Sequence, residues 1–98
     1  MNALVQGLWV GSHLSKMERL SIQSFIDNGH PYHLYTYGRV DNIPGGANVL
    51  DGNEILDESG IFQYEQHRSY SAFSNVFRYK LLLERGGWWV DTDMVCLK

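Results

Sequence analysis

The sequence is poor in several features that mark particular classes of protein. It holds one cysteine, Cys96, which excludes an internal disulfide and gives no sign of an oxidising compartment. It has 8 Lys and Arg against 11 Asp and Glu, a net charge of −3. This balance argues against nucleic acid as a partner, because proteins that bind it usually present a basic surface. No apolar run approaches the roughly 20 residues that a membrane span needs, so we expect no such span.

Several short motifs are also missing. The sequence contains neither a P-loop nor a Gly-x-Gly-x-x-Gly, which argues against phosphate binding in the Walker or dinucleotide manner. The 4 histidines lack the spacing of a helical or zinc-finger metal site. Residues 1–7 lack the basic start and long apolar core of a signal peptide. We therefore expect a bacterial cytoplasmic protein, or a trimmed part of a longer chain.

What the sequence does contain is the composition of a small globular domain. Hydrophobic residues make up 44% of the 98, which suits a folded core, and this length allows one domain at most. Strands are expected at 4–10, 32–37, 47–50 and from 88 onwards, helices at 16–28 and 74–85, a helical turn at 53–57, and loop or irregular helix at 58–71. A strand–helix–strand unit with short connections gives a parallel sheet. We expect an α/β, Rossmann-like fold with a mainly parallel sheet and flanking helices.

The first predicted helix has clear signals at both ends. Ser15 and Glu18 fit a capping box, which places the first helical residue at Lys16. Asn28-Gly29 is a good stop signal, and the helix cannot continue through Pro31.

Two carboxylates follow the last predicted strand. Asp91 and Asp93 are separated by one residue, and side chains at i and i+2 of a strand share one face. Ligands of open α/β sheets bind beyond the carboxyl ends of the strands, and two hard oxygen ligands there suit Mg²⁺ or Mn²⁺. The alternative is a polar turn, since Asp and Thr are common in turns. Asp51, after the third predicted strand, is a weaker candidate for the same rim, and a turn is the more ordinary role for it.

Arg78 lies on the less exposed side of the helix that precedes this strand. Lys80 and Glu84 form an i,i+4 pair that marks the solvent side, and Arg78 falls roughly 140° from the centre of that side. Asn75 lies on the same side as Arg78. An Arg turned away from solvent requires a partner. Its planar fork suits a phosphate, an Asp of the triplet or an acidic group elsewhere in the core.

Three motifs occur in an order that resembles one family. They are LWVG at 8–11, SNVFR at 74–78 and GGWWVDTD at 86–93. Together they resemble the DXD-containing sugar-binding region of glycosyltransferases. This group includes capsular and lipopolysaccharide hexosyltransferases, α-1,4-galactosyltransferases, mannosyltransferases and glucosylating toxins. The family pattern is Ser-Asp-x-x-Arg followed by Gly-Gly, a hydrophobic stretch and Asp-x-Asp, and Asn75 stands where the pattern has its first Asp.

The resemblance implies a single partial domain over 1–98, the N-terminal, donor-binding half of a GT-A fold. Such a domain would bind a UDP- or GDP-hexose through Mn²⁺ or Mg²⁺, for transfer of the hexose to a saccharide acceptor. By position, Asp93 would bind the metal directly, and Asp91 would contact the ribose or sugar and help to hold the metal. Arg78 would bind the donor sugar or the phosphates, beside Asn75, and Trp9 would stack on the nucleobase. The catalytic assignment therefore falls on Arg78 and Asp91.

Two other functions stay open at this point. One is a non-catalytic module that binds nucleotide sugar or only assembles, which the uncharged Asn75 and the short chain favour. The other is a phosphatase of the haloacid-dehalogenase type, because residues 88–95 also resemble its aspartate motif, in which the first Asp is the nucleophile. That motif opens its domain, whereas here it closes the chain. The last strand would present an open edge, from which we expect a homo-oligomer.

Overall fold

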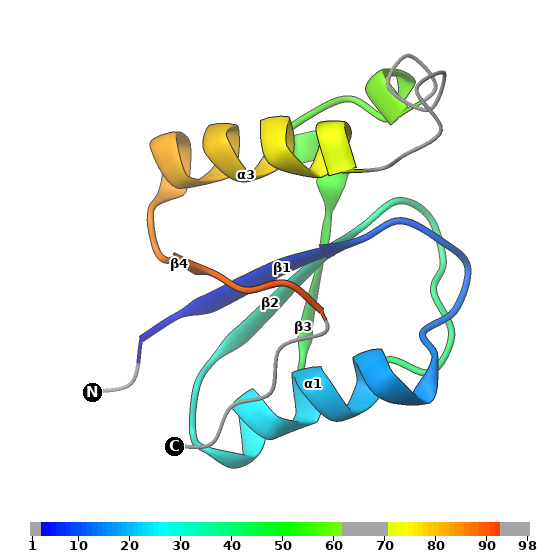
Figure 1. Cartoon of the computed structure of the whole chain (residues 1–98), viewed down its shortest axis with the longest axis vertical. Coiled ribbons are helices and arrows are strands. Elements are labelled where there is room, and N and C mark those ends of the chain that lie inside the picture. The colour runs from blue at the N-terminus through cyan, green and yellow to red at the C-terminus, as the bar shows by residue number, and fades with distance from the viewer. Residues whose placement is uncertain (1–2, 62–70, 93–98) are drawn as a thin grey trace.

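The computed structural model describes residues 3–61 and 71–92, and within them it shows a four-stranded parallel sheet between two helices (Figure 1). The strands are β1 (Val5–Trp9), β2 (Tyr32–Thr36), β3 (Asn48–Asp51) and β4 (Trp88–Trp89). Their order across the sheet is β3-β2-β1-β4, and each neighbouring pair runs parallel. The α/β, Rossmann-like fold with a parallel sheet is therefore confirmed, and so is the position of the last strand at an edge of the described sheet.

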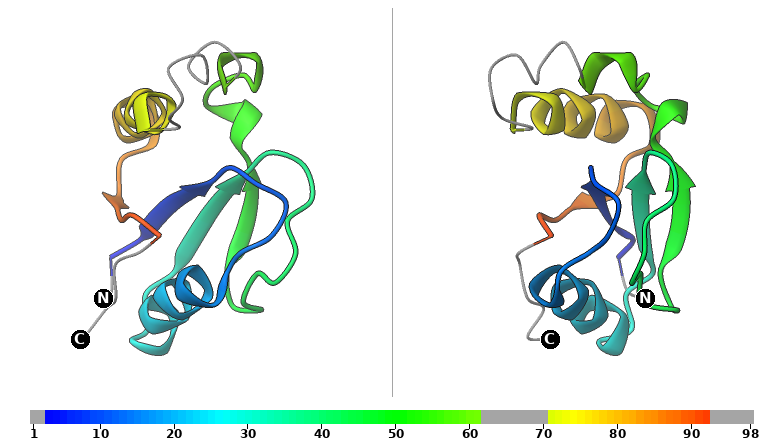
Figure 2. Two further views of the ribbon diagram at one scale, coloured as in Figure 1. Left: turned by 45° about the vertical axis from the view of Figure 1, so that its right-hand side comes forward. Right: turned by 90° about the vertical axis from the view of Figure 1, so that its right-hand side faces the viewer.

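Helix α1 (Lys16–Asp27) covers one face of the sheet, and α3 (Ser71–Arg85) covers the other, as both views in Figure 2 show. Residues of β1 alternate between the two layers. Val5 packs in the core beneath α1, whereas Leu8 packs in the core beneath α3. A strand buried on both faces is typical of parallel sheets, and this explains why residues 4–10 are almost continuously apolar.

Each helix buries one stripe against the sheet. In α1 the buried apolar residues are Ile22 and Phe25. In α3 the buried residues Phe73, Phe77 and Leu81 are spaced by four, which places them on one helical face. The capping box predicted for α1 is present, because the Glu18 carboxylate accepts hydrogen bonds from the Ser15 amide (3.3 Å) and from its hydroxyl (2.6 Å).

The observed boundaries differ from the predicted ones at a few places. Helix α3 begins at Ser71, three residues earlier than predicted, because Phe73 extends the buried stripe by one turn. Residues 52–54 form a short 3₁₀ helix, η1 (Gly52–Glu54), one residue before the helical turn we expected. Of the segment 58–71, predicted as loop or irregular helix, residues 59–61 are helical and Ser71 belongs to α3, while residues 62–70 lie outside the described residues. Over the described residues, no helix is both long and apolar enough to cross a bilayer.

Candidate functional site

A cleft of about 730 Å³ opens where β1 and β4 end. We call it the main cleft. Its lining comes from β1, β4 and the residues after them, from the first turn of α1 and from the first half of α3: Leu8, Trp9, Val10, Glu18, Ser74, Asn75, Arg78, Trp89, Val90, Asp91 and Thr92. The cleft brings together every site residue predicted by resemblance that the structure describes. Asp93, predicted to be the direct metal ligand, lies outside the described residues.

Trp9 lines the main cleft and is held by the turn that follows β1. Its indole Nε1 donates a hydrogen bond to the backbone carbonyl of His13 (3.1 Å), and its ring packs against the core beneath α1. Gly11 makes this turn possible, because its φ of 152° is one that residues with a side chain rarely adopt. A Cβ at Gly11 would also lie 3.1 Å from Trp9 Nε1. The ring is therefore a fixed, half-buried surface rather than a freely rotating side chain.

Arg78 and Asn75 reach the main cleft from α3. They are one turn apart, as predicted, and the buried Phe77 holds this part of the helix on the sheet. Lys80 and Glu84 are exposed, which confirms the predicted solvent side. Arg78 itself is half-buried.

The charge of Arg78 is uncommitted within the described part of the chain. The ion pairs found there are Arg39–Asp41 and Arg85–Glu54, so an ion pair of Arg78 with the triplet, one of the open alternatives, is not formed at Asp91. Its guanidinium carbon lies 5.0 Å from the ring centroid of Tyr79, a cation–π distance. This contact leaves the donors of the guanidinium edge for an anionic ligand in the cleft.

Asp91 lies two residues after the end of β4 and is positioned by a neighbour that sequence analysis did not select. The indole Nε1 of Trp89 donates a hydrogen bond to Asp91 Oδ1 (3.2 Å). Trp89 is in turn fixed against Phe77, with ring centroids 6.2 Å apart. The strand itself ends with a hydrogen bond from the Val90 amide to the Gln6 carbonyl (2.9 Å). The carboxylate is exposed, and within the described part of the chain its second oxygen has no hydrogen-bond partner.

The chemistry of Asp91 fits a divalent cation in a limited way. The described residues hold no cluster of three or more potential metal-ligating side chains, so they form no closed protein cage. Mg²⁺ and similar ions commonly use only one or two carboxylates and complete their coordination with water and substrate phosphates. One exposed carboxylate in a cleft that also holds an Arg suits that arrangement.

The structure also shows the surroundings of two further acidic residues, Glu18 and Asp51. Glu18 lines the main cleft, although from the sequence it had only a role in helix capping. Asp51 lies outside the main cleft, beside a smaller one of about 420 Å³. Its carboxylate accepts hydrogen bonds from the backbone and side-chain nitrogens of Asn53, both at 2.9 Å. Asp51 therefore has the turn role that was the more ordinary alternative.

Comparison with known proteins agrees with this geometry. The family model for the glycosyltransferase sugar-binding region containing a DXD motif matches residues 12–98. No curated protein and no solved structure matches the chain. The matched region includes the motifs at 74–78 and 86–93, while Trp9 precedes it. A parallel sheet with flanking helices is also the architecture of the N-terminal half of a GT-A fold. The chain belongs to the family of glycosyltransferase sugar-binding regions that contain a DXD motif.

Proposed function

We propose that the chain is the donor-binding half of a metal-dependent glycosyltransferase, which transfers a hexose from a nucleotide diphosphate sugar to a saccharide acceptor. One observation carries this proposal. A single cleft collects a fixed aromatic ring (Trp9), a guanidinium without an ion-pair partner among residues 3–61 and 71–92 (Arg78) and an exposed carboxylate (Asp91), and these come from β1, α3 and the end of β4. Family membership supports the class of reaction, and the cleft supports the class of donor.

The three groups match the three parts of such a donor. An aromatic face stacks on a nucleobase with little regard to its identity, so Trp9 is the natural place for the base. A guanidinium binds phosphate oxygens through two parallel hydrogen bonds, which assigns the diphosphate to Arg78. Asn75 lies one turn from Arg78 and can exchange hydrogen bonds with sugar hydroxyls without contributing charge.

Arg78 would act on the leaving group. When the glycosidic bond breaks, negative charge grows on the departing diphosphate, and a fixed positive charge at that place stabilises the transition state. The half-buried position of Arg78 favours this role, because a pre-positioned group needs no reorganisation during the reaction. Asp91, together with Asp93, would hold Mn²⁺ or Mg²⁺. When bound, such a cation supplies further Lewis-acid stabilisation to the diphosphate.

A non-catalytic donor-binding module is the second candidate, and Asn75 favours it. The family pattern has a carboxylate at this position. A neutral carboxamide can form hydrogen bonds there but cannot form an ion pair. The two candidates share the donor cleft and differ in turnover. Sustained sugar transfer by the purified chain would exclude the non-catalytic module.

Tryptophan fluorescence tests the donor site directly, because Trp9 and Trp89 line the main cleft. We expect a saturable change on titration with UDP-glucose, UDP-galactose or GDP-mannose in the presence of Mn²⁺. Arg78→Gln should weaken donor binding by roughly 10- to 100-fold, since hydrogen bonds to charged groups contribute about 1.5–3 kcal/mol. The matched control is Arg39→Gln, because the Arg39 side chain is 92% exposed and lies outside the cleft lining. Equal affinities of the unchanged chain and Arg78→Gln would contradict the proposal.

The metal assignment has its own test in the same titration. Replacing Asp91 or Asp93 by Asn should remove the dependence of donor binding on Mn²⁺. In an intact enzyme, Asp93→Asn should lower the rate of sugar transfer by on the order of 10²–10³. Binding that is equally strong with and without Mn²⁺ would exclude a bridging metal.

A further inference from the structure

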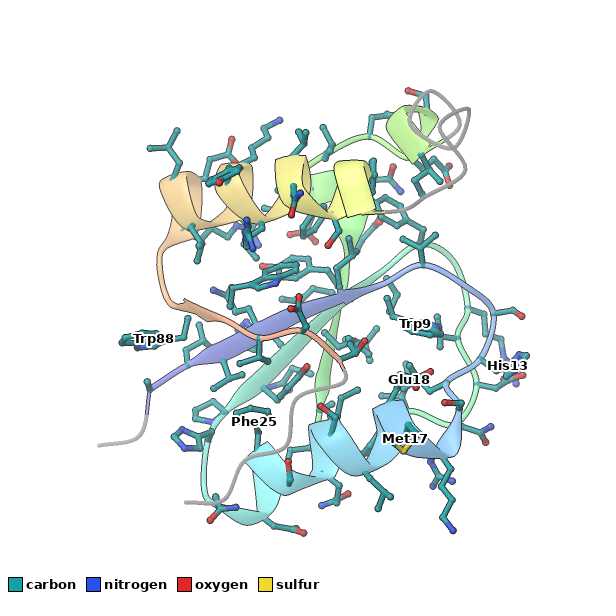
Figure 3. The ribbon with its side chains drawn as sticks, viewed as in Figure 1. Trp9, His13, Met17, Glu18, Phe25 and Trp88 are labelled. Atoms are coloured by element: carbon teal, nitrogen blue, oxygen red, sulfur yellow. The ribbon has the colours of Figure 1, made fainter. Side chains whose placement is uncertain are left out.

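Two tryptophans are neighbours in β4, and their side chains have opposite surroundings. The side chain of Trp88 is 66% exposed and points away from the sheet at its edge (Figure 3). The side chain of Trp89 lines the main cleft and donates a hydrogen bond to Asp91, the first carboxylate of the Asp-x-Asp motif. Building on the proposed function, we infer that Trp89 is a positioning residue whose indole N–H holds Asp91 in the orientation that binds the cation.

The indole that donates this hydrogen bond is itself fixed. The backbone of Trp89 pairs with Gln6 of β1, and its side chain packs against the core beneath α3. Its ring centroid lies 6.2 Å from that of Phe77, and the ring is half-buried. The indole N–H can only donate. An indole held in this way presents one hydrogen-bond donor at a defined place in the cleft.

Asp91 receives little support from the sheet itself. It lies two residues after the end of β4, and its carboxylate is exposed. The hydrogen bond from Trp89 Nε1 to Asp91 Oδ1 (3.2 Å) restricts the carboxylate, and Oδ2 has no hydrogen-bond partner within the described part of the chain. Carboxylates that bind metals are commonly held by hydrogen bonds of their own. A group that is already ordered also loses less conformational entropy when its ligand binds.

The same contacts connect Asp91 to the helix that carries Arg78. Phe77 precedes Arg78 in α3. The ring of Trp89 packs on Phe77, while its N–H holds Asp91. In the proposed function the guanidinium and the cation act on one diphosphate, so the separation of the two positive charges has to match that group. Trp89 packs on the helix and holds the carboxylate, and it therefore helps to fix this separation.

Isothermal titration calorimetry with UDP and GDP tests this role, because Trp89 is itself a fluorophore and its replacement would alter a fluorescence readout. Trp89→Phe keeps an aromatic ring beside Phe77 and removes the N–H. Loss of a group that holds a metal ligand commonly costs roughly 10- to 100-fold in metal affinity, so we expect a loss of this size in the binding measured with Mn²⁺. The weaker binding without Mn²⁺ should be unchanged. Trp88→Phe is the matched control and should match the unchanged chain in both conditions.

A second variant separates the N–H from the shape of the ring. Trp89→benzothienylalanine replaces the indole N–H by sulfur and keeps the size of the side chain. It should show the same loss of Mn²⁺-dependent binding as Trp89→Phe, at an unchanged melting temperature. This variant keeps the test decisive if Trp89→Phe loosens the packing on Phe77.

The outcomes separate this inference from the function on which it rests. If the unchanged chain binds neither diphosphate, the proposed function fails and the inference fails with it. If Mn²⁺-dependent binding keeps its strength in both Trp89 variants, the donor site stands and the role of the indole N–H is wrong. A loss of equal size with and without Mn²⁺ would make Trp89 a part of the cleft wall, and this too would overturn its role at the metal site.

Discussion

At the scale of single residues, three tyrosines in and just after β2 differ in whether the side-chain hydroxyl has a hydrogen-bond partner. The Tyr35 hydroxyl accepts a hydrogen bond from Arg85 (3.1 Å), and the Tyr37 hydroxyl donates one to the Leu56 carbonyl (2.6 Å). The Tyr32 hydroxyl is buried and has no hydrogen-bond partner among the described residues. Burial raises the pKa of Tyr32, and the nearby charge of Asp91 raises it further. Burial also raises the pKa of Tyr37.

Tyr32→Phe should therefore stabilise the fold, whereas Tyr37→Phe should destabilise it. A buried hydroxyl without a partner costs about 1–3 kcal/mol, and removing a satisfied one loses about 1 kcal/mol. Urea unfolding at pH 7 measures both changes, with each variant serving as the control for the other. A destabilisation of equal size in the two variants would show that the Tyr32 hydroxyl is satisfied after all.

The same variants test how the free energy of unfolding changes with pH. A tyrosine whose pKa is raised on folding leaves the free energy of unfolding independent of pH well below the ordinary pKa of its side chain, about 10. Above that value the free energy of unfolding falls, because the unfolded chain then releases the proton more readily. The free energy of unfolding should fall above about pH 10, and Tyr32→Phe should make the fall shallower.

At the scale of elements, the junction of α3 and β4 determines where Asp91 lies. Gly86 and Gly87 have φ angles of 70° and 91°, and glycine accepts such angles at little cost. The Gly86 amide donates to the Leu82 carbonyl (3.0 Å) and ends the helix. The Gly86 carbonyl accepts from Gln6 Nε2 (2.6 Å), which ties the junction to β1. Two glycines thus turn the chain from the helix into the edge strand.

Alanine at these two positions should have unequal effects. At Gly86 a Cβ would meet no atom within 4 Å, whereas at Gly87 it would collide with the Gln6 side chain. Gly86→Ala should cost about 1–2 kcal/mol for the left-handed backbone alone. Gly87→Ala should cost more in urea unfolding and should also weaken Mn²⁺-dependent donor binding, because β4 and Asp91 must shift. Equal losses at both positions would mean that the contact with Gln6 does not constrain the junction.

The elements themselves were largely predictable because their signals are local. Ser15 and Glu18 marked the start of α1, and the glycine pair marked the passage from α3 to β4. The predicted start of α3 was three residues too late. Phe73 belongs to the helix because it packs against the sheet, and the sequence before it contains no start signal. The apolar run from Trp88 predicted a strand, but β4 spans only Trp88–Trp89, since pairing with β1 decides its length.

At the scale of the whole molecule, the predictable part of the site is the part carried by motifs. Arg78, Asn75 and Asp91 were predicted from the resemblance of two segments to the family pattern, and the fold brings them into one cleft with Trp9. Glu18 and the support of Asp91 by Trp89 were not predicted, because both depend on how α1 and β4 meet the sheet. When one residue both caps a helix and lines a cleft, the sequence pattern shows only its capping role. The predicted homo-oligomer stays a prediction, with β4 at the sheet edge as its structural basis.

The main cleft joins the two layers of the molecule, and this predicts how a ligand should affect global stability. Glu18 lies in α1 and Arg78 lies in α3, on opposite faces of the sheet, and both line the main cleft, so we expect a nucleotide diphosphate bound there to link both helices. At ten times its Kd, a ligand that binds only the folded state adds ~1.4 kcal/mol. For a domain of this size, 1 kcal/mol raises the melting temperature by about 4–8 °C.

We expect UDP or GDP with Mn²⁺, at a fixed concentration, to raise the melting temperature of the unchanged chain in thermal unfolding followed by circular dichroism. Trp9 packs against the core beneath α1, so the rise should be smaller in Trp9→Leu and also in Arg78→Gln, because each variant removes the contact to one layer. Inorganic pyrophosphate is the control ligand, since it has no base, and its effect should depend on Arg78 but not on Trp9. A rise with the nucleotide that only one of the two variants reduces would show that the ligand rests on one layer alone, and the cleft would then be a site on one helix rather than a link between both.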